Sequence, residues 1–375
     1  MSGIYIHIPF CKQACHYCDF HFSTNLTQMD TMVRMLCEEI ALRKTFFKDN
    51  SPIESIYFGG GTPSILQTHH LDLILNAIYS NYRLDIKELT LEANPDDLNT
   101  EKLKGFKKLG FNRLSIGIQS FDQQVLEFYN RAHSAKESLI AIDLAKSAGF
   151  EKLSVDLIYG YPHHDHSIWQ KDLLTALSLD PGHISSYALT IEPKTALGNW
   201  SKKGKFQEAS EDFVAEQFEL LVEESEKAGY VQYEISNFGK EGHFALHNSS
   251  YWKNIPYLGV GPGAHSYDGN SRGANIANNN LYIKKLQLGE LPFEIEPMEQ
   301  SDSCNEYILT SLRTIWGTDL NYLKEKFGVD LLSRQETILL GLQKEGLIAI
   351  TEDKITLSKK GKILADGIAA SLFID

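Results

Sequence analysis

The chain has 375 residues, of which 42% are hydrophobic and 23% charged, and its formal net charge is −13. A chain of this length can bury a large core and suggests two or three domains. The acidic balance argues against nucleic acid as a partner, because phosphate binding needs clustered Lys and Arg. No run approaches the roughly 20 apolar residues of a spanning helix, and no basic-then-apolar leader opens the chain, so we expect a cytoplasmic protein without a transmembrane segment.

Three of the five cysteines lie close together near the N-terminus. Cys11, Cys15 and Cys18 have C-x3-C-x2-C spacing and follow an apolar run, residues 4–8, that predicts a strand. A loop that leaves a strand end can bring three thiolates together, and thiolate sulfur is the ligand of iron-sulfur clusters. Four irons need four terminal ligands, so three cysteines leave one iron open to a reactant.

A structural zinc site is the alternative interpretation of these cysteines. Such sites are closed by a fourth Cys or His at close spacing. His16 lies between two of the cysteines, where ligation would distort the chelate, and His21 follows them. A disulfide is disfavoured because the count is odd, and Cys37 and Cys304 are remote residues that we interpret as buried apolar side chains. The spacing therefore favours a cluster over zinc.

At these residues the sequence resembles the radical SAM superfamily, in which the motif binds a [4Fe-4S] cluster and the open iron takes S-adenosylmethionine. The flanking segments 5–11 and 17–20 are similar to those of the branch that contains oxygen-independent coproporphyrinogen III oxidase and a group of heme chaperones. The resemblance runs nearly the full length of the chain. It implies that Tyr5 and Phe20 are among the cofactor-binding residues.

Up to about residue 230, short apolar runs alternate with helical patterns. This alternation predicts an α/β fold in which helices cover a parallel sheet. Periodicity alone leaves a flat doubly wound sheet open, and the resemblance selects a partial (β/α)6 radical SAM barrel. We predict strands at 4–8, 53–58, 89–91, 113–118, 152–158 and 183–189. We predict helices at 29–47, 71–79, 137–148, 168–177 and 208–228.

The second predicted strand ends in a glycine run, residues 59–61, followed by Thr62. Ligands gather at the carboxyl ends of parallel strands, and glycines let the backbone approach a ligand closely. A glycine run by itself fits a simple tight turn equally well. After the cluster motif, the resemblance implies that Gly60, Gly61 and Thr62 hold the amino group of S-adenosylmethionine.

Polar side chains also mark the ends of the next strands. Glu92 and Gln119 could bind ribose hydroxyls through hydrogen bonds, although either one alone fits an ordinary surface polar group. Asp156 lies inside an apolar strand, where a carboxylate is costly unless it is paired or faces a ligand. The resemblance places Glu92, Gln119, Arg131 and Asp156 at ligand-contacting positions, with Arg131 able to meet a methionyl carboxylate or a propionate.

Residues 231–300 are rich in Gly, Asn, Tyr and His and show little periodicity, so we expect an irregular extension. They contain the segment H-N-S-S-Y-W, residues 247–252. A lone His beside aromatic residues is more often a packing residue, whereas a neutral imidazole can ligate heme iron and flat side chains suit a macrocycle. The segment is similar to the motif of the heme chaperones, which implies His247 as a heme ligand.

Residues 301–375 predict helices at 306–316, 321–327 and 332–345, followed by a hairpin of 347–350 and 354–357. This pattern indicates a winged-helix-like α+β domain. We therefore expect the chain to have three domains, at 1–230, 231–300 and 301–375. The candidate recognition helix carries two cations, Arg334 and Lys344, too few to favour DNA binding. Domains of this kind serve as a cap or docking element in the resembled family.

Two functions of the resembled branch remain. The oxidase decarboxylates two propionates of coproporphyrinogen III to vinyl groups. Its motif has one more cysteine where Phe20 stands here, and only ten residues precede Cys11, whereas the oxidases carry a longer extension that shields a radical from water. The main hypothesis is therefore a chaperone that binds a [4Fe-4S] cluster, S-adenosylmethionine and heme, and delivers heme to acceptor proteins.

The sequence leaves several properties open. It assigns no catalytic residue, and it leaves undecided whether S-adenosylmethionine is consumed by an enzyme or only bound. It does not identify the heme acceptor, nor whether acceptors bring the protein into peripheral contact with a membrane. A monomer and a homodimer both fit.

Overall fold

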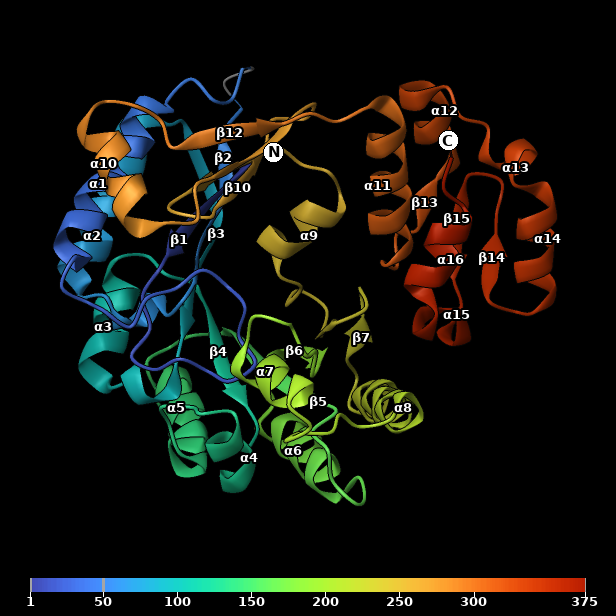
Figure 1. The fold of residues 1–375 in the computed structure, drawn as a ribbon, viewed down its shortest axis with the longest axis horizontal. Coiled ribbons are helices and arrows are strands. Elements are labelled where there is room, and N and C mark those ends of the chain that lie inside the picture. Colours follow the sequence, from blue (N-terminus) through green and yellow to red (C-terminus); the bar gives the residue numbers. More distant parts are fainter. Residues whose placement is uncertain (1, 49–50, 375) are drawn as a thin grey trace.

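The computed structural model describes residues 2–48 and 51–374. Within them, one large sheet has the strand order β12-β11-β10-β9-β1-β2-β3-β4-β5-β6-β8-β7. Strands β1 to β6 are parallel neighbours in chain order (Figure 1). They are β1 (Ser2–Ile8), β2 (Ile53–Gly60), β3 (Leu84–Ala93), β4 (Arg113–Gln119), β5 (Lys152–Tyr159) and β6 (Gly182–Ala188). All six predicted strands are confirmed.

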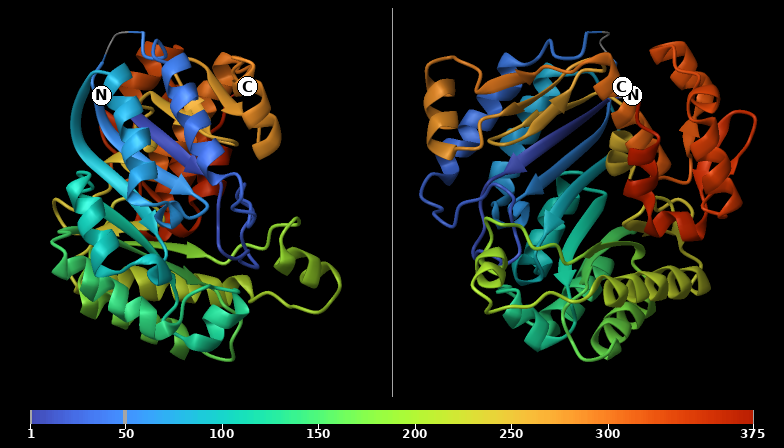
Figure 2. Two further views of the ribbon diagram at one scale, coloured as in Figure 1. Left: turned by 90° about the vertical axis from the view of Figure 1, so that its left-hand side faces the viewer. Right: turned by 45° about the vertical axis from the view of Figure 1, so that its right-hand side comes forward.

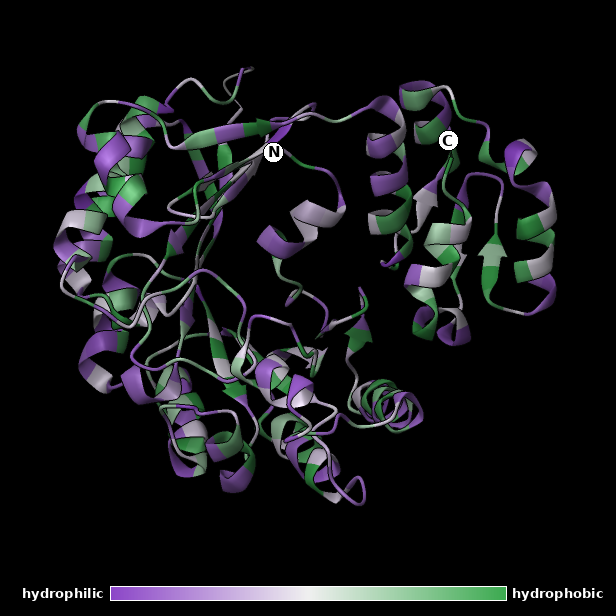
Figure 3. Cartoon of the chain, in the orientation of Figure 1, coloured by the Kyte–Doolittle hydropathy of each residue, from purple (hydrophilic) through white to green (hydrophobic). Residues whose placement is uncertain are grey.

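Helices connect these strands and cover one face of the sheet (Figure 2). Hydrophobic and hydrophilic residues alternate around α1 and α2 in Figure 3, because each helix buries one face, as Leu36 and Ile40 do in α1. The helices are α1 (Met29–Leu42), α2 (Thr68–Asn81), α3 (Thr100–Lys108), α4 (Gln123–Phe128), α5 (Ala135–Ser147), α6 (Ser167–Leu179), α7 (Ala196–Lys202) and α8 (Glu211–Lys227), with 3-10 turns at Pro63–Ile65 and Pro95–Asp97. The predicted helices are confirmed, and the short helices α3, α4 and α7 were not predicted.

The sheet does not close on itself. The free side of β1 pairs with β9 (Tyr257–Val260), and the free side of β6 pairs with β8 (Asn237–Gly239). Strands β1 and β6 therefore never meet, which agrees with the predicted partial barrel. Because β1 to β6 are parallel, their carboxyl ends share one edge of the sheet, where ligands bind in folds of this class.

Residues 231–300 differ from the expected irregular extension. They add β7 (Val231–Gln232), β8, β9, β10 (His265–Tyr267), β11 (Arg272–Asn275) and β12 (Phe293–Glu296) to the two ends of the sheet. They also form α9 (Leu246–Trp252) and α10 (Asn279–Gln287). Strands of two to four residues are too short to produce a readable alternation, so the sequence pattern did not reveal them.

A buried carboxylate on α1 ties this segment to the barrel. The Glu39 side chain is fully buried and pairs with Arg43 at 3.2 Å. It also accepts hydrogen bonds from the Tyr282 hydroxyl at 2.6 Å, the Asn275 amide at 2.8 Å and the Gly261 N–H at 2.9 Å. Because every oxygen is satisfied, the charge is tolerated inside the protein and fixes α10 and β11 against α1.

The C-terminal domain has its own hydrophobic core and stands beside the barrel in Figure 1. Cys304 lies in that core, fully buried, as expected. The hairpin and the helices before it follow the predicted winged-helix-like pattern. The elements are α11 (Gln300–Leu312), β13 (Thr318–Asp319), α12 (Leu320–Phe327), α13 (Leu331–Arg334), α14 (Glu336–Lys344), β14 (Ile348–Ile350), β15 (Lys354–Leu357), α15 (Lys359–Ile363) and α16 (Ala365–Ser371). Among the described helices, none combines the length and apolar character needed to cross a bilayer.

Candidate functional site

A cavity of about 470 Å³ opens at the carboxyl ends of the parallel strands, beside the loop that follows β1. This volume is in the range of small-molecule sites. Parallel pairing brings residues far apart in sequence to the same edge of the sheet. Most of the predicted site residues line this cavity, namely Cys11, Cys15, Cys18, Phe20, Gly60, Gly61, Thr62, Glu92, Gln119, Arg131 and Asp156.

The three cysteines are free, half-buried thiols on one loop. Backbone hydrogen bonds hold this loop, from the Cys11 N–H to the Ser23 carbonyl at 3.1 Å and from the His16 N–H to the Tyr129 carbonyl at 3.0 Å. Burial raises the pKa of Cys11 to about 11 and the pKa of Cys18 to about 12. These thiols therefore stay protonated at neutral pH unless a metal stabilises the thiolates.

The donor set fits a cluster with one open iron better than a closed zinc site. The His16 ring lies 2.7 Å from the Phe128 carbonyl through Nδ1 and packs edge-on against Trp200. The His21 Nε2 atom lies 2.8 Å from the Asn279 side-chain oxygen. Both nearby imidazoles are thus engaged elsewhere, and three sulfur ligands without a fourth are what a [4Fe-4S] cluster with a substrate-binding iron requires.

Glu92 and the glycine run form one hydrogen-bonded unit. The Glu92 carboxylate accepts the Gly60 N–H at 3.2 Å and the Tyr57 hydroxyl at 2.8 Å. Gly60 has a φ of +108°, and a Cβ at this position would lie 2.6 Å from the His7 ring, so the turn requires glycine. Burial raises the pKa of Glu92 to about 7, with a further rise from Asp156. An ammonium or hydroxyl group that donates a hydrogen bond to this carboxylate favours its deprotonated, charged form.

Gln119 ends β4 in a strained conformation. Its φ is +67°, and the register of β4 against β5 shifts between Gly117 and Gln119. A non-glycine residue in this region costs about 1–3 kcal/mol. The carboxamide lines the cavity and makes no hydrogen bond to another described residue. The strain therefore presents an unpaired donor and acceptor to a ligand.

Arg131 connects the cysteine loop to the strand ends. Its guanidinium donates to the Cys15 sulfur and the Tyr17 hydroxyl, both at 3.3 Å, and to the Asn94 side chain at 2.6 Å and the Gly117 carbonyl at 2.8 Å. The Nε atom is buried and has no partner within the described chain. A guanidinium with a spare donor beside a sulfur ligand can both offset thiolate charge and receive a carboxylate.

Asp156 reaches the cavity from β5, as the sequence predicted. The Ser115 hydroxyl lies 3.1 Å from each of its carboxylate oxygens. Burial raises the pKa of Asp156 to about 6, while hydrogen bonds from Ser185 and Ser115 oppose the rise. The cavity thus holds two carboxylates, Glu92 and Asp156, that are ready to accept hydrogen bonds from hydroxyl groups.

The sequence interpretation missed several lining residues. Tyr57 and Asn94 adjoin the recognised motifs, and their position beside a strand end was an available signal. Ser115 and Tyr187 carry no signal of their own, because only the strand register turns them into the cavity. Asn248 follows His247 directly and lines the cavity without a hydrogen-bond partner in the described chain.

Two predicted residues occupy peripheral places. Tyr5 lies outside the cavity lining, where its hydroxyl is 3.1 Å from His7 Nδ1 and its ring stacks on Tyr57. Phe20 lines the cavity but is 68% exposed. Tyr5 therefore supports the cavity wall, while Phe20 offers a flat apolar surface to anything bound at the rim.

His247 also lies outside the cavity lining and is 1% exposed. Its Nδ1 is 2.9 Å from the Ser55 hydroxyl, and its Nε2 is 2.9 Å from the Tyr251 hydroxyl one turn further along α9. The ring stacks on Tyr57 with centroids 5.1 Å apart. Burial lowers the pKa of His247 to about 4, so the ring is neutral, which is the form that ligates iron. In this arrangement each ring nitrogen lies within hydrogen-bond distance of a hydroxyl group.

A buried ion pair holds α9 in place. Glu88 and Arg113 are each 1% exposed, with the Arg113 Nε 2.9 Å from the carboxylate. The same carboxylate accepts the backbone N–H groups of Leu246 at 3.0 Å and His247 at 2.9 Å, and Arg113 donates to the carbonyls of residues 243–244. The first turn of α9 is therefore fixed to β3 and β4 by charge-assisted hydrogen bonds.

Comparison with known proteins gives consistent results. The model of the radical SAM superfamily matches residues 5–173. The heme chaperone HemW of Bacillus subtilis is 35% identical over 373 residues, covering 98% of each chain. HemW of Lactococcus lactis is 31% identical over 376 residues, covering 100% of this chain and 98% of the relative.

The fold has a solved counterpart. The coproporphyrinogen III oxidase HemN from Escherichia coli superposes with a TM-score of 0.85, covering 99% of this chain and 90% of its own. Sequence identity between the two is 20%, so this likeness describes the fold and not the reaction.

Proposed function

Because the chain belongs to the HemW family within the radical SAM superfamily, we propose that it is a heme chaperone that binds heme and transfers it to acceptor proteins. The observation that carries this proposal is the place of α9. This helix presents Asn248 to the strand-end cavity and holds His247 directly behind the Tyr57 ring. One short helix thus contributes both to the cavity for the cluster and S-adenosylmethionine and to the candidate heme site at His247.

The cavity suits the two cofactors of the superfamily. We assign the [4Fe-4S] cluster to Cys11, Cys15 and Cys18, where it would supply one electron when reduced. Arg131 would then offset the negative charge of the thiolates through its bond to Cys15.

The remaining cavity residues are assigned to S-adenosylmethionine by their chemistry. Glu92 can accept its ammonium, and the unpaired carboxamide of Gln119 and the carboxylate of Asp156 can bind ribose hydroxyls. The free donor of Arg131 can receive the carboxylate. We assign the lining residues Gly60, Gly61 and Thr62 to the same ligand. A Cβ at Gly61 would lie 2.6 Å from the Phe10 carbonyl oxygen, so only glycine lets this turn pack against the start of the cysteine loop.

We assign heme ligation to His247, with one structural condition. Iron can reach a ring nitrogen only after Ser55 or Tyr251 releases it, because both nitrogens are within hydrogen-bond distance of a hydroxyl. Tyr251 lies on α9 itself and Ser55 on β2, so a movement of α9 away from the sheet frees Nδ1. Heme binding should therefore be accompanied by a displacement of α9.

The test is a heme titration followed by the Soret band, with full-length protein. His247→Ala should weaken heme binding by at least about tenfold, because a nitrogen ligand to iron is lost. Ser55→Ala should accelerate heme association, because it removes the partner of Nδ1 at the cost of about 1 kcal/mol of stability. His265→Ala is the matched control, since this imidazole is exposed on β10. Equal heme affinity of native protein and His247→Ala would remove the ligand assignment.

A second assay separates the chaperone from the oxidase. Protein with a reconstituted, reduced cluster is incubated anaerobically with S-adenosylmethionine and coproporphyrinogen III, and the porphyrins are separated by chromatography. We expect no decarboxylated product. Catalytic turnover to vinyl products would identify an oxidase despite Phe20, and His247 would then need another role.

A further inference from the structure

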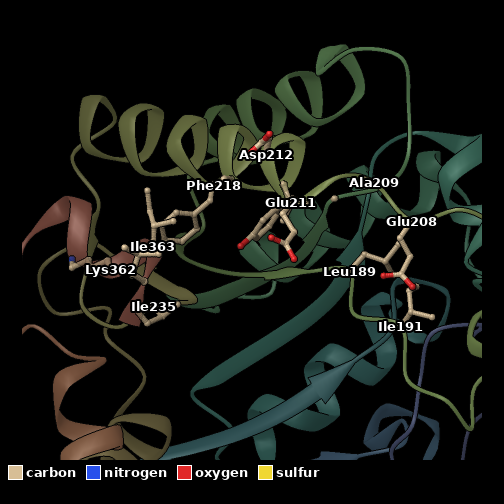
Figure 4. A pocket seen from close by; sticks show the side chains of 15 residues that line it. Leu189, Ile191, Glu208, Ala209, Glu211, Asp212, Phe218, Ile235, Lys362 and Ile363 are labelled. Carbon is tan, nitrogen blue, oxygen red and sulfur yellow. The ribbon is translucent and has the colours of Figure 1, made fainter. Parts of the chain in front are cut away.

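A second cavity, of about 520 Å³, lies between α8, the loop after β6 and α15 of the C-terminal domain (Figure 4). It is distinct from the strand-end cavity, although Leu189 lines both. Most of its lining residues are apolar, and they come from five parts of the chain, among them Tyr159, Leu189, Ala215, Phe218, Ile235 and Ile363. None of the residues assigned above to the cluster, S-adenosylmethionine or heme lines this space.

Two carboxylates face this apolar lining. Figure 4 shows the carboxyl ends of Glu211, in the first turn of α8, and of Glu208, in the loop before α8, turned toward the cavity. Asp212 also belongs to the lining, but its carboxyl end lies on the other side of the helix in this view. Neither Glu208 nor Glu211 makes a hydrogen bond or ion pair with any other described residue. Tyr159, which is only 8% exposed, also lines the cavity, and its hydroxyl has no hydrogen-bond partner within residues 2–48 and 51–374.

No Lys or Arg of the described residues forms an ion pair with these two carboxylates. The three lysines of the preceding loop, Lys202, Lys203 and Lys205, form no ion pair with them in the described chain. Lys362 also lines the cavity, but its ammonium is 3.1 Å from the Gln232 side-chain oxygen, and Figure 4 shows it directed away from Glu211. The cavity therefore combines an apolar wall, two exposed carboxylates without a cationic partner in the described chain and the unpaired hydroxyl of the buried Tyr159.

We propose that this cavity binds an organic ammonium, that is, a protonated amine carried on an apolar body. The apolar part would displace water from Phe218, Ile235 and Ile363, while the ammonium would donate to Glu208, Glu211 and the Tyr159 hydroxyl. Ligands with carboxylates, including tetrapyrroles, are disfavoured because like charges would meet at Glu208 and Glu211. The ammonium can belong to a free amine or to a lysine side chain of another protein.

The test is calorimetric titration of the full-length protein with 1-hexylammonium chloride, with 1-hexanol and hexanoate as probes of the same chain length. We expect hexylammonium to bind, hexanol to bind more weakly, and hexanoate to bind least. Glu211→Gln should weaken hexylammonium binding by about tenfold, because a charge-assisted hydrogen bond is lost. Glu219→Gln is the matched control, with the same substitution on the same helix at an exposed residue outside the cavity lining, and should leave binding unchanged.

A cavity-filling variant, Ala215→Trp, should abolish binding of hexylammonium, with retained folding checked by circular dichroism. The peptide acetyl-Leu-Lys-Leu-amide and its Nε-acetyllysine form then distinguish the two sources of the ammonium. Tighter binding of the lysine peptide than of hexylammonium indicates a protein partner, and the reverse indicates a free amine. No hexylammonium binding, equal binding of hexanol, or an equal loss in Glu219→Gln would overturn the proposal.

Discussion

The strand-end cavity and the surroundings of His247 share one wall, yet they hold their polar groups in opposite states. In the cavity, Gln119 is strained and unpaired and the Nε of Arg131 has no partner in the described chain. Around His247, both ring nitrogens and the backbone N–H are within hydrogen-bond distance of a partner. Unpaired buried groups indicate a site formed in advance for ligands, whereas a satisfied histidine indicates a closed site that must open.

Tyr57 belongs to both regions. Its hydroxyl donates to Glu92 in the cavity, and its ring stacks on His247. A ligand that takes the place of the Tyr57 hydroxyl at Glu92 would therefore affect the ring that packs against His247, the heme ligand that we assign. Tyr57 therefore connects the strand-end cavity to His247, and substitutions on either side of it can test this connection.

The largest effect is expected in the strand-end cavity, at the cysteines. Cys15→Ser should abolish the visible absorbance of a reconstituted cluster, because a hydroxyl replaces one of three sulfur ligands. Heme binding should persist, since Cys15 lies outside the surroundings of His247. Cys37→Ser, a half-buried thiol on α1, is the control and should leave the cluster spectrum intact. An intact cluster in Cys15→Ser would show that the ligand set is different.

The second largest effect is expected near His247, at the buried ion pair of Glu88 and Arg113 that holds α9. Glu88→Gln should lower the free energy of unfolding by about 3–5 kcal/mol, because Arg113 is left buried without its counter-charge. It should also weaken heme binding, since the N–H groups of Leu246 and His247 lose a charged acceptor.

Glu54→Gln is the matched control for this substitution, and both variants are compared by chemical denaturation. Glu54 pairs with Lys87 at 2.9 Å, and the Lys87 side chain is 54% exposed whereas that of Glu54 is 11% exposed. Because Lys87 stays in contact with water when it loses this partner, the substitution should cost about 1 kcal/mol. Similar losses of stability in the two variants would contradict the anchoring role of Glu88.

The smallest effect is a pH dependence set by Glu92. Burial raises its pKa from 4.5 to about 7, so the folded protein holds this proton more tightly than the unfolded chain. The resulting stabilisation is fully present below pH 4.5 and is lost as the pH rises through 7, by up to about 3 kcal/mol. Denaturation of ligand-free protein between about pH 5 and 8 should show this fall, and Glu92→Gln should reduce it. Parallel profiles for the two proteins would exclude Glu92 as the source.

Much of the cavity could be predicted from the sequence. Glu92 and Gln119 were found because they lie at strand ends, which must reach the shared edge of the sheet. Asp156 was found because a carboxylate inside an apolar strand needs a partner or a ligand. Ser115 and Tyr187 were not found, because their direction depends on the register between strands. The strands of residues 231–300 were missed because each is too short to show a period.

By itself, the sequence determined the family, the three-cysteine motif and the alternation of strands and helices, because these depend on local spacing and periodicity. Only the tertiary structure decided that β9 and β8 pair with the free sides of β1 and β6, that His247 is buried between Ser55 and Tyr251, and that Glu208 and Glu211 face a second cavity. These properties arise from contacts between residues far apart in the chain. A side chain's partners and its exposure are set by the elements that pack around it, which no local pattern contains.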